Sequence, residues 1–413
     1  MRPDIVIFSL FRTDNPYSSI SLSMAKALAP SVRVLYVNHP YSWKDLIKGI
    51  FQGNPALRPR LKNLLLFRTH QETLDTIPHN CWVITPPPTI PINWLPPGKV
   101  YDYFQRLNNR IVLGCIARAT QAFEFHNYLY INCYNPFFAG WLPPEMGAKL
   151  SLYHCIDDIS QNAYTARHGI QLEAKACQQA DCTLVTSTNL YQLKAPIARR
   201  VQTFFNAADV AIFAKARTES YPRPEALNHR PRQVIGFIGN LDELRIDYVL
   251  LRQIAQHFPD KTLLLVGPVN STAPAEIGLT DLPNVVFAGS RPLQDLPPLL
   301  QYMDCVLIPF LCNTLTFSIY PLKINEYLAA GKPVVSSRFS ADIGTFAPYI
   351  YLADDSESFI RQIGSALQEN NPASVSERVA VANQNTWEAR IEQLFALVNT
   401  LSETTIPNHG TKT

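Results

Sequence analysis

The chain has 413 residues, a hydrophobic content of 47% and a charged content of 17%, values typical of a globular protein rather than a disordered one. Because a single hydrophobic core rarely extends over so many residues, the length predicts two domains. The formal net charge of only +3 argues against a general attraction to nucleic acid, and no nucleic-acid partner is expected.

The eight cysteines have neither the paired spacing of a zinc site nor a disulfide framework. We expect buried free thiols in a reducing compartment. The chain enters an apolar run at Ile5 without a secretory cleavage region, and no stretch approaches the ~18 apolar residues that span a bilayer. These features predict a cytoplasmic protein, with peripheral contact to the inner face of the cell membrane left open.

Short β-branched runs alternate with longer amphipathic segments along the chain, which predicts parallel sheets covered by helices on both faces. A helix is expected after the polar loop 11–19 and a loop at the proline-rich residues 86–97. In the first half, strands are expected at residues 5–8, 32–37, 64–67, 82–84, 129–133, 150–154 and 183–186.

Residues 214–232 are polar and rich in proline, which is typical of a linker. Beyond them the alternation restarts, with strands expected at residues 234–238, 263–266, 285–288, 306–309 and 334–336. The prediction is an α/β protein with a first Rossmann-like domain at 1–213 and a second at 233–385. Two such sheets facing across a cleft bind ligands at the carboxyl ends of their strands.

The segment 320–336 (Tyr-Pro-Leu-Lys-Ile-Asn-Glu-Tyr-Leu-Ala-Ala-Gly-Lys-Pro-Val-Val-Ser) carries the strongest functional pattern. A helix beginning near Pro321 offers free backbone N–H groups and a partial positive charge to an anion such as a diphosphate. Lys323 in its first turn opposes the helix dipole, which favours an anionic partner. Glu326, on the same face, suits a ribose diol. An ordinary helix with a solvated Lys/Glu pair fits the spacing equally well.

Pro-Leu-Lys-x-x-Glu-Tyr-Leu-Ala-Ala-Gly-Lys-Pro-Val-Val resembles the nucleotide-sugar signature of GT-B glycosyltransferases in the glycosyltransferase group 1 superfamily, of the exopolysaccharide and teichuronic-acid type. The resemblance implies sugar transfer from a nucleotide diphosphate donor, most simply a UDP-sugar, to a glycan or lipid-linked acceptor. It also implies that Glu326 holds the ribose and Lys323 faces the phosphates. Many relatives carry a glutamate where this chain has Ser318, which leaves the stereochemical course open and tilts it towards inversion.

The resemblance extends over the second half of the chain. Gly239 ends a strand, and its lack of a side chain permits close approach of a phosphate, although a purely structural glycine is as consistent. Arg291 follows another strand end. A final helix at about 386–401 resembles the one that crosses back to the first domain. The residues expected to bind the donor are Gly239, Asn240, Arg291, Ser318, Tyr320, Pro321, Leu322, Lys323 and Glu326.

In the first half, His154, Asp157 and Asp158 follow a predicted strand. An inverting transfer needs a base that deprotonates the acceptor hydroxyl, and similar enzymes carry an Asp-Asp pair here. We assign Asp157 as the base and Asp158 as its support. A helix N-cap is the competing interpretation. Arg12 and Asp14, in the loop after the first strand, are candidates for the acceptor side or ordinary solvated residues.

Residues Trp43–Arg68 hold six basic side chains and one acid, interleaved with apolar residues at near-helical spacing. Such a segment fits an anionic membrane surface or, as the favoured alternative, packing on its own domain. Neither a carboxylate cluster nor an Asp-x-Asp motif occurs, so no metal site is expected and the helix dipole with Lys323 would stabilise the leaving diphosphate. Competing functions are a nucleotide-sugar epimerase, a non-catalytic scaffold of a polysaccharide assembly complex and, least favoured, a dehydrogenase.

Overall fold

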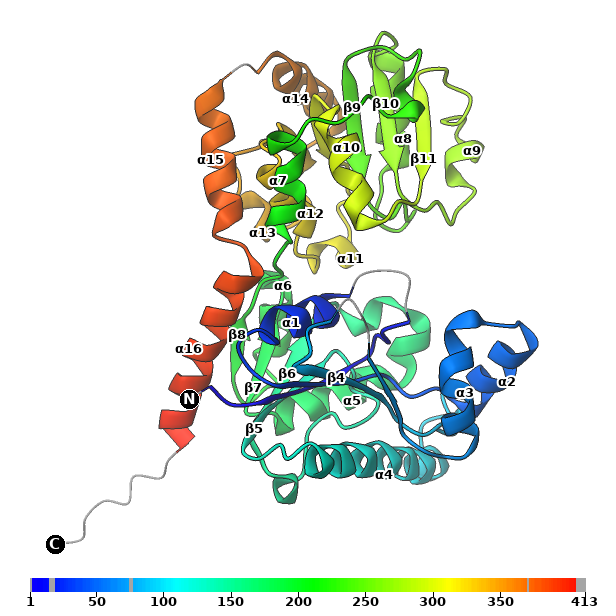
Figure 1. Cartoon of the computed structure of the whole chain (residues 1–413). Helices are drawn as coiled ribbons and strands as arrows, with labels where there is room; N and C mark the ends of the chain where they lie inside the picture. Colours follow the sequence, from blue (N-terminus) through cyan, green and yellow to red (C-terminus); the bar gives the residue numbers. More distant parts are fainter. Residues whose placement is uncertain (1, 15–18, 74–76, 370, 406–413) are drawn as a thin grey trace, which may run out of the picture. The chain divides into compact units, whose positions relative to one another are not determined.

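The computed structural model describes residues 2–14, 19–73, 77–369 and 371–405 (Figure 1). The chain divides into two compact units, each of which is an α/β sandwich. The first comprises Met1–Thr186, Leu190–Phe204 and Ile391–Thr413, and the second Ser187–Asn189 and Phe205–Arg390.

The linker predicted at 214–232 requires a correction. Helix α7 (Val210–Thr218) extends into this segment, and Leu227 is completely buried in a core cluster of the second unit. The segment therefore belongs to the second unit, because its few apolar side chains find places in that core despite the polar composition around them.

The first unit is built on an eight-stranded sheet in the order β3-β4-β2-β1-β5-β6-β7-β8. All neighbouring strands pair in parallel except β3 and β4, which are antiparallel. The strands are β1 (Ile5–Ser9), β2 (Val34–Val37), β3 (His70–Glu72), β4 (Cys81–Thr85), β5 (Tyr128–Cys133), β6 (Ala148–Cys155), β7 (Cys182–Val185) and β8 (Val201–Thr203). The central strands are buried along their whole length, as expected for a sheet covered on both faces.

The helices that accompany this sheet are α1 (Ile20–Leu28), α2 (Trp43–Phe51), α3 (Arg58–Leu65), α4 (Lys99–Ala122), α5 (Ala163–Gln179), α6 (Thr188–Lys194) and α16 (Trp387–Thr405), with short 3-10 turns at Pro55–Leu57, Pro144–Met146 and Ile159–Gln161. Helices α6 and α16 are divided between the units. The long helix α4 packs Val112, Cys115 and Ile116 against strands β1, β2 and β5.

A strand predicted at 64–67 is wrong, because α3 runs to Leu65. The predicted strand rests on a run of three consecutive leucines. They instead end a helix that starts with a proline in its first turn and buries Leu64 against Tyr41, Leu46 and Leu57. Proline is favourable at the start of a helix, so this proline indicates the local structure better than the leucine run does.

The second unit contains a six-stranded, wholly parallel sheet in the order β11-β10-β9-β12-β13-β14. Its strands are β9 (Val234–Ile238), β10 (Thr262–Val266), β11 (Val285–Gly289), β12 (Cys305–Ile308), β13 (Val334–Ser337) and β14 (Tyr351–Ala353). Besides α7, its helices are α8 (Tyr248–His257), α9 (Ala273–Glu276), α10 (Leu296–Gln301), α11 (Thr314–Phe317), α12 (Leu322–Ala329), α13 (Ala341–Gly344), α14 (Ser356–Gln368) and α15 (Pro372–Asn383), with 3-10 turns at Glu225–Leu227 and Leu293–Asp295.

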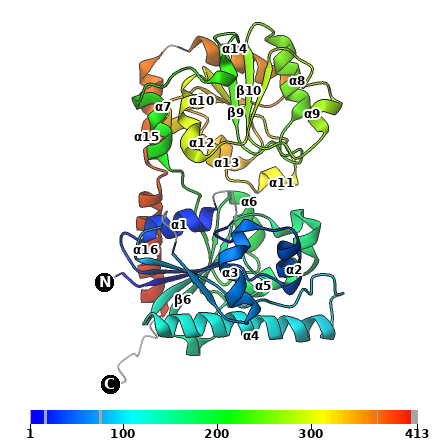
Figure 2. The same cartoon turned by 45° about the vertical axis from the view of Figure 1, so that its right-hand side comes forward.

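Alternate residues of strand β9 enter two separate cores, as the two-residue period of a strand requires. Val234 and Ile238 pack with α10 and α12 on one face, whereas Ile235 and Phe237 pack with α8 and α14 on the other. Figure 2 shows the sheet of this unit with α8 on one side and α10 and α12 on the opposite side. The predicted parallel α/β architecture is confirmed.

The strand order reverses once in each sheet, between β1 and β5 in the first unit and between β9 and β12 in the second. Helical connections leave these neighbouring strands in opposite directions, which opens a crevice at their carboxyl ends where open α/β sheets bind ligands. The fold therefore singles out the loops after β1, β5, β9 and β12.

Two further properties bear on the expectations from the sequence. None of the helices in the described part of the chain is both long and apolar enough to cross a bilayer. All eight cysteines are free, and seven are buried, with Cys312 exposed.

Candidate active site

In the second unit, helix α12 begins directly after Pro321, at the carboxyl end of the sheet. Lys323 Nζ donates a hydrogen bond to Glu326 Oε2 at 2.7 Å, and the Glu326 residue is only 6% exposed whereas Lys323 is half-buried. A carboxylate held this deep keeps a fixed direction, and the lysine remains accessible to an anion at the helix start.

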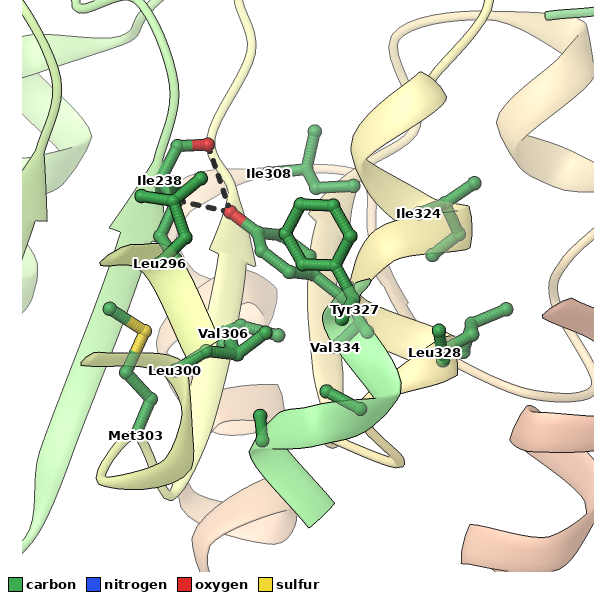
Figure 3. Packing of buried hydrophobic residues seen from close by; sticks show 14 of the residues in the cluster. Ile238, Leu296, Leu300, Met303, Val306, Ile308, Ile324, Tyr327, Leu328 and Val334 are labelled. Carbon is green, nitrogen blue, oxygen red and sulfur yellow. Dashed lines mark hydrogen bonds between the residues drawn. The ribbon is translucent and has the colours of Figure 1, made fainter. Parts of the chain in front are cut away.

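Tyr327 fixes this helix beside the end of strand β9. Its hydroxyl accepts a hydrogen bond from the Ile238 N–H at 2.9 Å and donates one to the Ile238 carbonyl oxygen at 3.3 Å (Figure 3). The phenol ring is fully buried among the aliphatic side chains of α10 and β12. The start of α12 and the loop that opens with Gly239 therefore flank the point where the strand order reverses.

Gly267 makes the loops after β9 and β10 approach each other closely. Its φ is +147°, and a Cβ atom at this position would lie 1.7 Å from the Gly239 carbonyl oxygen. The Gly239 N–H donates to the Val266 carbonyl oxygen, and the Gly267 N–H donates to that of Gly289, each at 2.9 Å. The sequence singled out Gly239 and missed Gly267, although both follow an expected strand directly.

Asn240 is exposed and lines a cavity of about 240 Å³ together with Asp242, Glu243, Leu244, Asn270 and Ser271. This cavity lies between the loops that follow β9 and β10. Arg291 is exposed just after β11 and does not line it. Polar groups from two strand ends thus meet beside the predicted donor loop.

Two of the residues predicted to bind the donor, Ser318 and Tyr320, are buried. Ser318 is 1% exposed and ends helix α11, and Tyr320 is 5% exposed. The Tyr320 ring stacks on Phe205 with 5.0 Å between centroids, and its hydroxyl accepts a hydrogen bond from Asn325 Nδ2. Burial raises the pKa of the Tyr320 phenol. Pro321 is also buried and Leu322 is half-buried, and a part of these four residues in donor binding stays a prediction.

In the first unit, His154 lies within strand β6 and is 1% exposed. Its ring packs edge-on against Phe204, and burial lowers its pKa to about 4. His154 is therefore buried in the sheet rather than open at the strand end, and its catalytic role stays a prediction.

The two aspartates after β6 have different surroundings. Asp158 is the N-cap of the Ile159–Gln161 turn and accepts hydrogen bonds from the Ser160 N–H at 3.0 Å and the Ser160 hydroxyl at 2.7 Å. Asp157 is half-buried. Burial and the nearby Asp157 carboxylate raise the pKa of Tyr134, whose φ of +56° is an unusual backbone conformation for a tyrosine. The two hydrogen bonds from Ser160 support the capping interpretation for Asp158.

Arg12 and Asp14 belong to an ordered ionic network rather than to a solvated loop. Asp14 pairs with Arg60 at 2.8 Å and with Arg12 at 3.2 Å, and it also accepts from the Tyr41 hydroxyl. The Arg12 guanidinium lies 4.0 Å from the centre of the Tyr41 ring. Arg60 is buried and also binds the Glu72 carboxylate. Arg12 and Asp14 are thus anchored to Tyr41 and Arg60.

His39 and Asn135 join the two sides of the crevice in the first unit, and the sequence analysis missed both. Asn135, which follows β5, donates from Nδ2 to His39 Nδ1 at 3.0 Å and to the Ser9 carbonyl oxygen at 3.3 Å. The second bond fixes the amide orientation, so Nε2 of the neutral imidazole carries the proton. Burial, assisted by Arg12, lowers the pKa of His39 to about 3. His39 and Asn135 each lie within two residues of the end of an expected strand, which was the available signal for the individual residues but not for their contact.

Comparison with known proteins supports the resemblance found in the sequence. Residues 232–369 match the family model described as glycosyl transferases group 1. TuaH of Bacillus subtilis (strain 168), assigned as a teichuronic acid biosynthesis glycosyltransferase, is 27% identical over 232 residues. That alignment covers 54% of this chain and 58% of TuaH, so it spans less than two thirds of the relative.

Solved structures share the fold at low sequence identity. Sucrose-phosphate synthase from Thermosynechococcus elongatus has a TM-score of 0.64 at 16% identity, over 97% of this chain and all of that one. Anabaena HepE in complex with UDP gives 0.63 at 15%, over 96% and 100%. The α,α-trehalose-phosphate synthase of Burkholderia vietnamiensis gives 0.67 at 11%, over 98% and 100%.

These findings confirm the predicted fold and identify a domain of the predicted family within the second half of the chain. Residues 232–369 form a glycosyl transferases group 1 domain, and the chain that carries it has the GT-B fold.

Proposed function

We propose that the chain is a glycosyltransferase that moves a sugar from a nucleotide diphosphate donor to a glycan or lipid-linked acceptor in the synthesis of cell-surface polysaccharide. The observation that carries this proposal is the Lys323–Glu326 pair at the start of α12, beside the strand reversal of the matched domain. TuaH is assigned as a glycosyltransferase, and HepE has been solved in complex with UDP and with UDP-glucose. These two likenesses favour a UDP-sugar as the donor.

In this proposal the second unit binds the donor. Glu326 accepts hydrogen bonds from the ribose hydroxyls, and Lys323 with the N–H groups of α12 faces the diphosphate. The carboxylate and the amine bind each other, which orients both groups. Preformed charges stabilise a leaving diphosphate without a reorganisation cost during the reaction. That this requires no metal ion stays a prediction.

The first unit would bind the acceptor. An acceptor hydroxyl oxygen forms a bond to the anomeric carbon of the sugar, the bond to the diphosphate breaks, and the diphosphate leaves with the electron pair. If the course is inverting, the hydroxyl proton passes to a base, for which we propose Asp157. His39, with its Nε2–H, suits the role of a neutral donor towards an acceptor oxygen, and Arg12 suits an anionic acceptor group.

We also propose peripheral contact with a membrane through Trp43–Arg68. Helix α2 buries Leu46 in a small cluster of the first unit but leaves Ile47, Ile50 and Phe51 at 54%, 44% and 87% exposure. Packing on the first unit therefore accounts for only part of its apolar surface. Exposed apolar side chains beside basic ones are typical of segments that lie on an anionic bilayer.

The test is a panel of UDP-, GDP-, dTDP- and ADP-sugars, measured for thermal stabilisation and for products with and without polysaccharide or lipid-linked acceptors. Acceptor-dependent release of the nucleotide supports the transferase. An altered free sugar released without acceptor would indicate the epimerase, and absence of binding to every donor would indicate the scaffold.

A further inference from the structure

A cavity of about 400 Å³ opens on the first unit, away from the loops at the strand reversal. It is lined by Arg68 from the turn after α3, by Arg110 and Arg118 from α4, and by Phe67, Thr69, Pro87 and Ile111. Its size is that of a small-ligand site, and three of its seven lining residues are arginines.

The three arginines are exposed. Within the described part of the chain, none of them has a carboxylate within ion-pair distance, in contrast to Arg12, Arg33 and Arg60 of the same unit. Three guanidinium groups around one concavity repel each other unless an anion lies between them. The cavity therefore has the charge complementary to a phosphate group.

Helix α4 leaves room between the two of its arginines that line the cavity. Arg110, Gly114 and Arg118 follow one another at intervals of four residues, which places them along one side of the helix. A Cβ atom at Gly114 would meet only the Arg118 Nη1 atom, at 3.4 Å. A glycine in the middle of a 24-residue helix is unfavourable by itself, and here it keeps the space between the two guanidinium groups open.

Arg68 is brought to the cavity by a strained turn. Phe67 adopts a φ of +55°, in the region where helix ends normally have glycine. The Phe67 N–H donates to the Leu64 carbonyl oxygen and the Arg68 N–H to that of Asn63, so the turn closes α3 and reverses the chain. The bulky ring of Phe67 is 48% exposed at the mouth, next to the exposed Leu65 and Leu66.

We propose that this cavity binds the phosphate group of an ester that also carries an apolar chain. The arginines would donate charge-assisted hydrogen bonds to the phosphate oxygens, and Phe67, Pro87 and Ile111 would contact the apolar part. Such an ester has two sources, a lipid in a bilayer or a soluble organophosphate. The inference concerns binding in the first unit and does not depend on the proposed sugar transfer.

The experiment measures binding of the full chain to decyl phosphate by calorimetry, and to phosphatidylcholine vesicles with and without phosphatidic acid by sedimentation. The test variants are Arg110→Ala/Arg118→Ala, which removes the charge, and Gly114→Met, which fills the space and keeps every charge. The matched control is Arg106→Ala, one turn earlier on the same helix and outside the cavity lining.

We expect Arg110→Ala/Arg118→Ala to bind at least about tenfold more weakly than the wild type, because each lost charge-assisted hydrogen bond costs about one decade in affinity. Gly114→Met should show a similar loss, because its side chain occupies the space between the two guanidinium groups. The Arg106→Ala variant should bind normally. Binding to the vesicles but weakly to decyl phosphate identifies a bilayer lipid, and the reverse identifies a soluble ester. No binding by the wild type, or equal losses in the Arg106→Ala control, would overturn the proposal. Normal binding by Gly114→Met would also overturn it, because binding would then depend on surface charge and not on the space between the two arginines.

Discussion

At the scale of single residues, the hydrogen bond between Asn135 and His39 leaves the imidazole as a neutral donor at the crevice of the first unit. We predict that His39→Phe lowers kcat about tenfold or more, since the lost bond is made to a substrate oxygen, and leaves the KM for the donor unchanged. His39→Gln, whose amide N–H resembles the Nε2–H, should recover much of the activity. Steady-state kinetics check this, and equal losses in both variants would argue for a merely structural role.

Variants of the two aspartates after β6 should differ in activity in the same assay. Asp157→Asn removes the proposed base and should lower kcat by about 10²-fold or more. Asp158→Asn should stay near the wild type in activity and melting temperature, because asparagine caps a helical turn as well as aspartate does. If Asp158→Asn were the inactive variant, the roles assigned to the pair would be reversed.

Sequence patterns placed Gly239 at a strand end and Lys323 with Glu326 on one helix, because each belongs to a local motif whose neighbours determine its position. They did not reveal that Tyr320 and Ser318 are buried, since a motif does not show which side chains point inwards. His39 and Asn135 are 96 residues apart, so their contact depends on the order of strands in the sheet. No local pattern contains that information.

At the scale of elements, Gly267 is the residue on which the packing of the loops after β9 and β10 depends. We predict that Gly267→Ala lowers the free energy of unfolding by about 3 kcal/mol or more, because its φ is unfavourable for alanine and the new methyl group would collide with the Gly239 carbonyl oxygen.

Chemical denaturation measures this effect, and Gly364→Ala is the matched control. Gly364 lies in helix α14, has no atom within 4 Å of its would-be Cβ, and should gain about 0.5–1 kcal/mol as alanine. Equal effects of the two substitutions would mean that the close approach at Gly267 relaxes without cost.

Long buried strands were predictable from the sequence, and short edge strands were not. All five strands expected in the second unit occur, from β9 to β13, whereas the three-residue strands β3, β8 and β14 were missed. Edge strands of this length carry too few residues to display a period. The helix α3, expected as a strand, shows that an apolar run alone does not distinguish the two structures.

At the scale of the whole molecule, the buried His154 and the half-buried His39 predict how stability depends on pH. His154 and His39 have pKa values lowered to about 4 and about 3 in the folded chain, below the ordinary value of about 6.5. At pH values between these lowered pKa values and about 6.5, the unfolded chain therefore binds more protons than the folded chain. The free energy of unfolding falls as the pH drops below about 6.5.

Between about pH 7 and pH 4.5, the free energy of unfolding of the wild type should fall by about 2 kcal/mol more than that of His154→Phe. Denaturant unfolding at several pH values measures the difference, with the exposed His126→Gln as the control. A pH dependence unchanged in His154→Phe would contradict the buried, neutral state of this histidine.

The central claim is that the second unit binds a nucleotide diphosphate through Glu326, and calorimetric titration of the full chain with UDP tests it most directly. We predict that UDP binds the wild type, that Glu326→Gln weakens this binding about tenfold or more, and that Glu357→Gln, which alters an exposed carboxylate paired with Arg361 on α14, leaves it unchanged. Absence of UDP binding, or equal affinity in Glu326→Gln and the wild type, would contradict the claim.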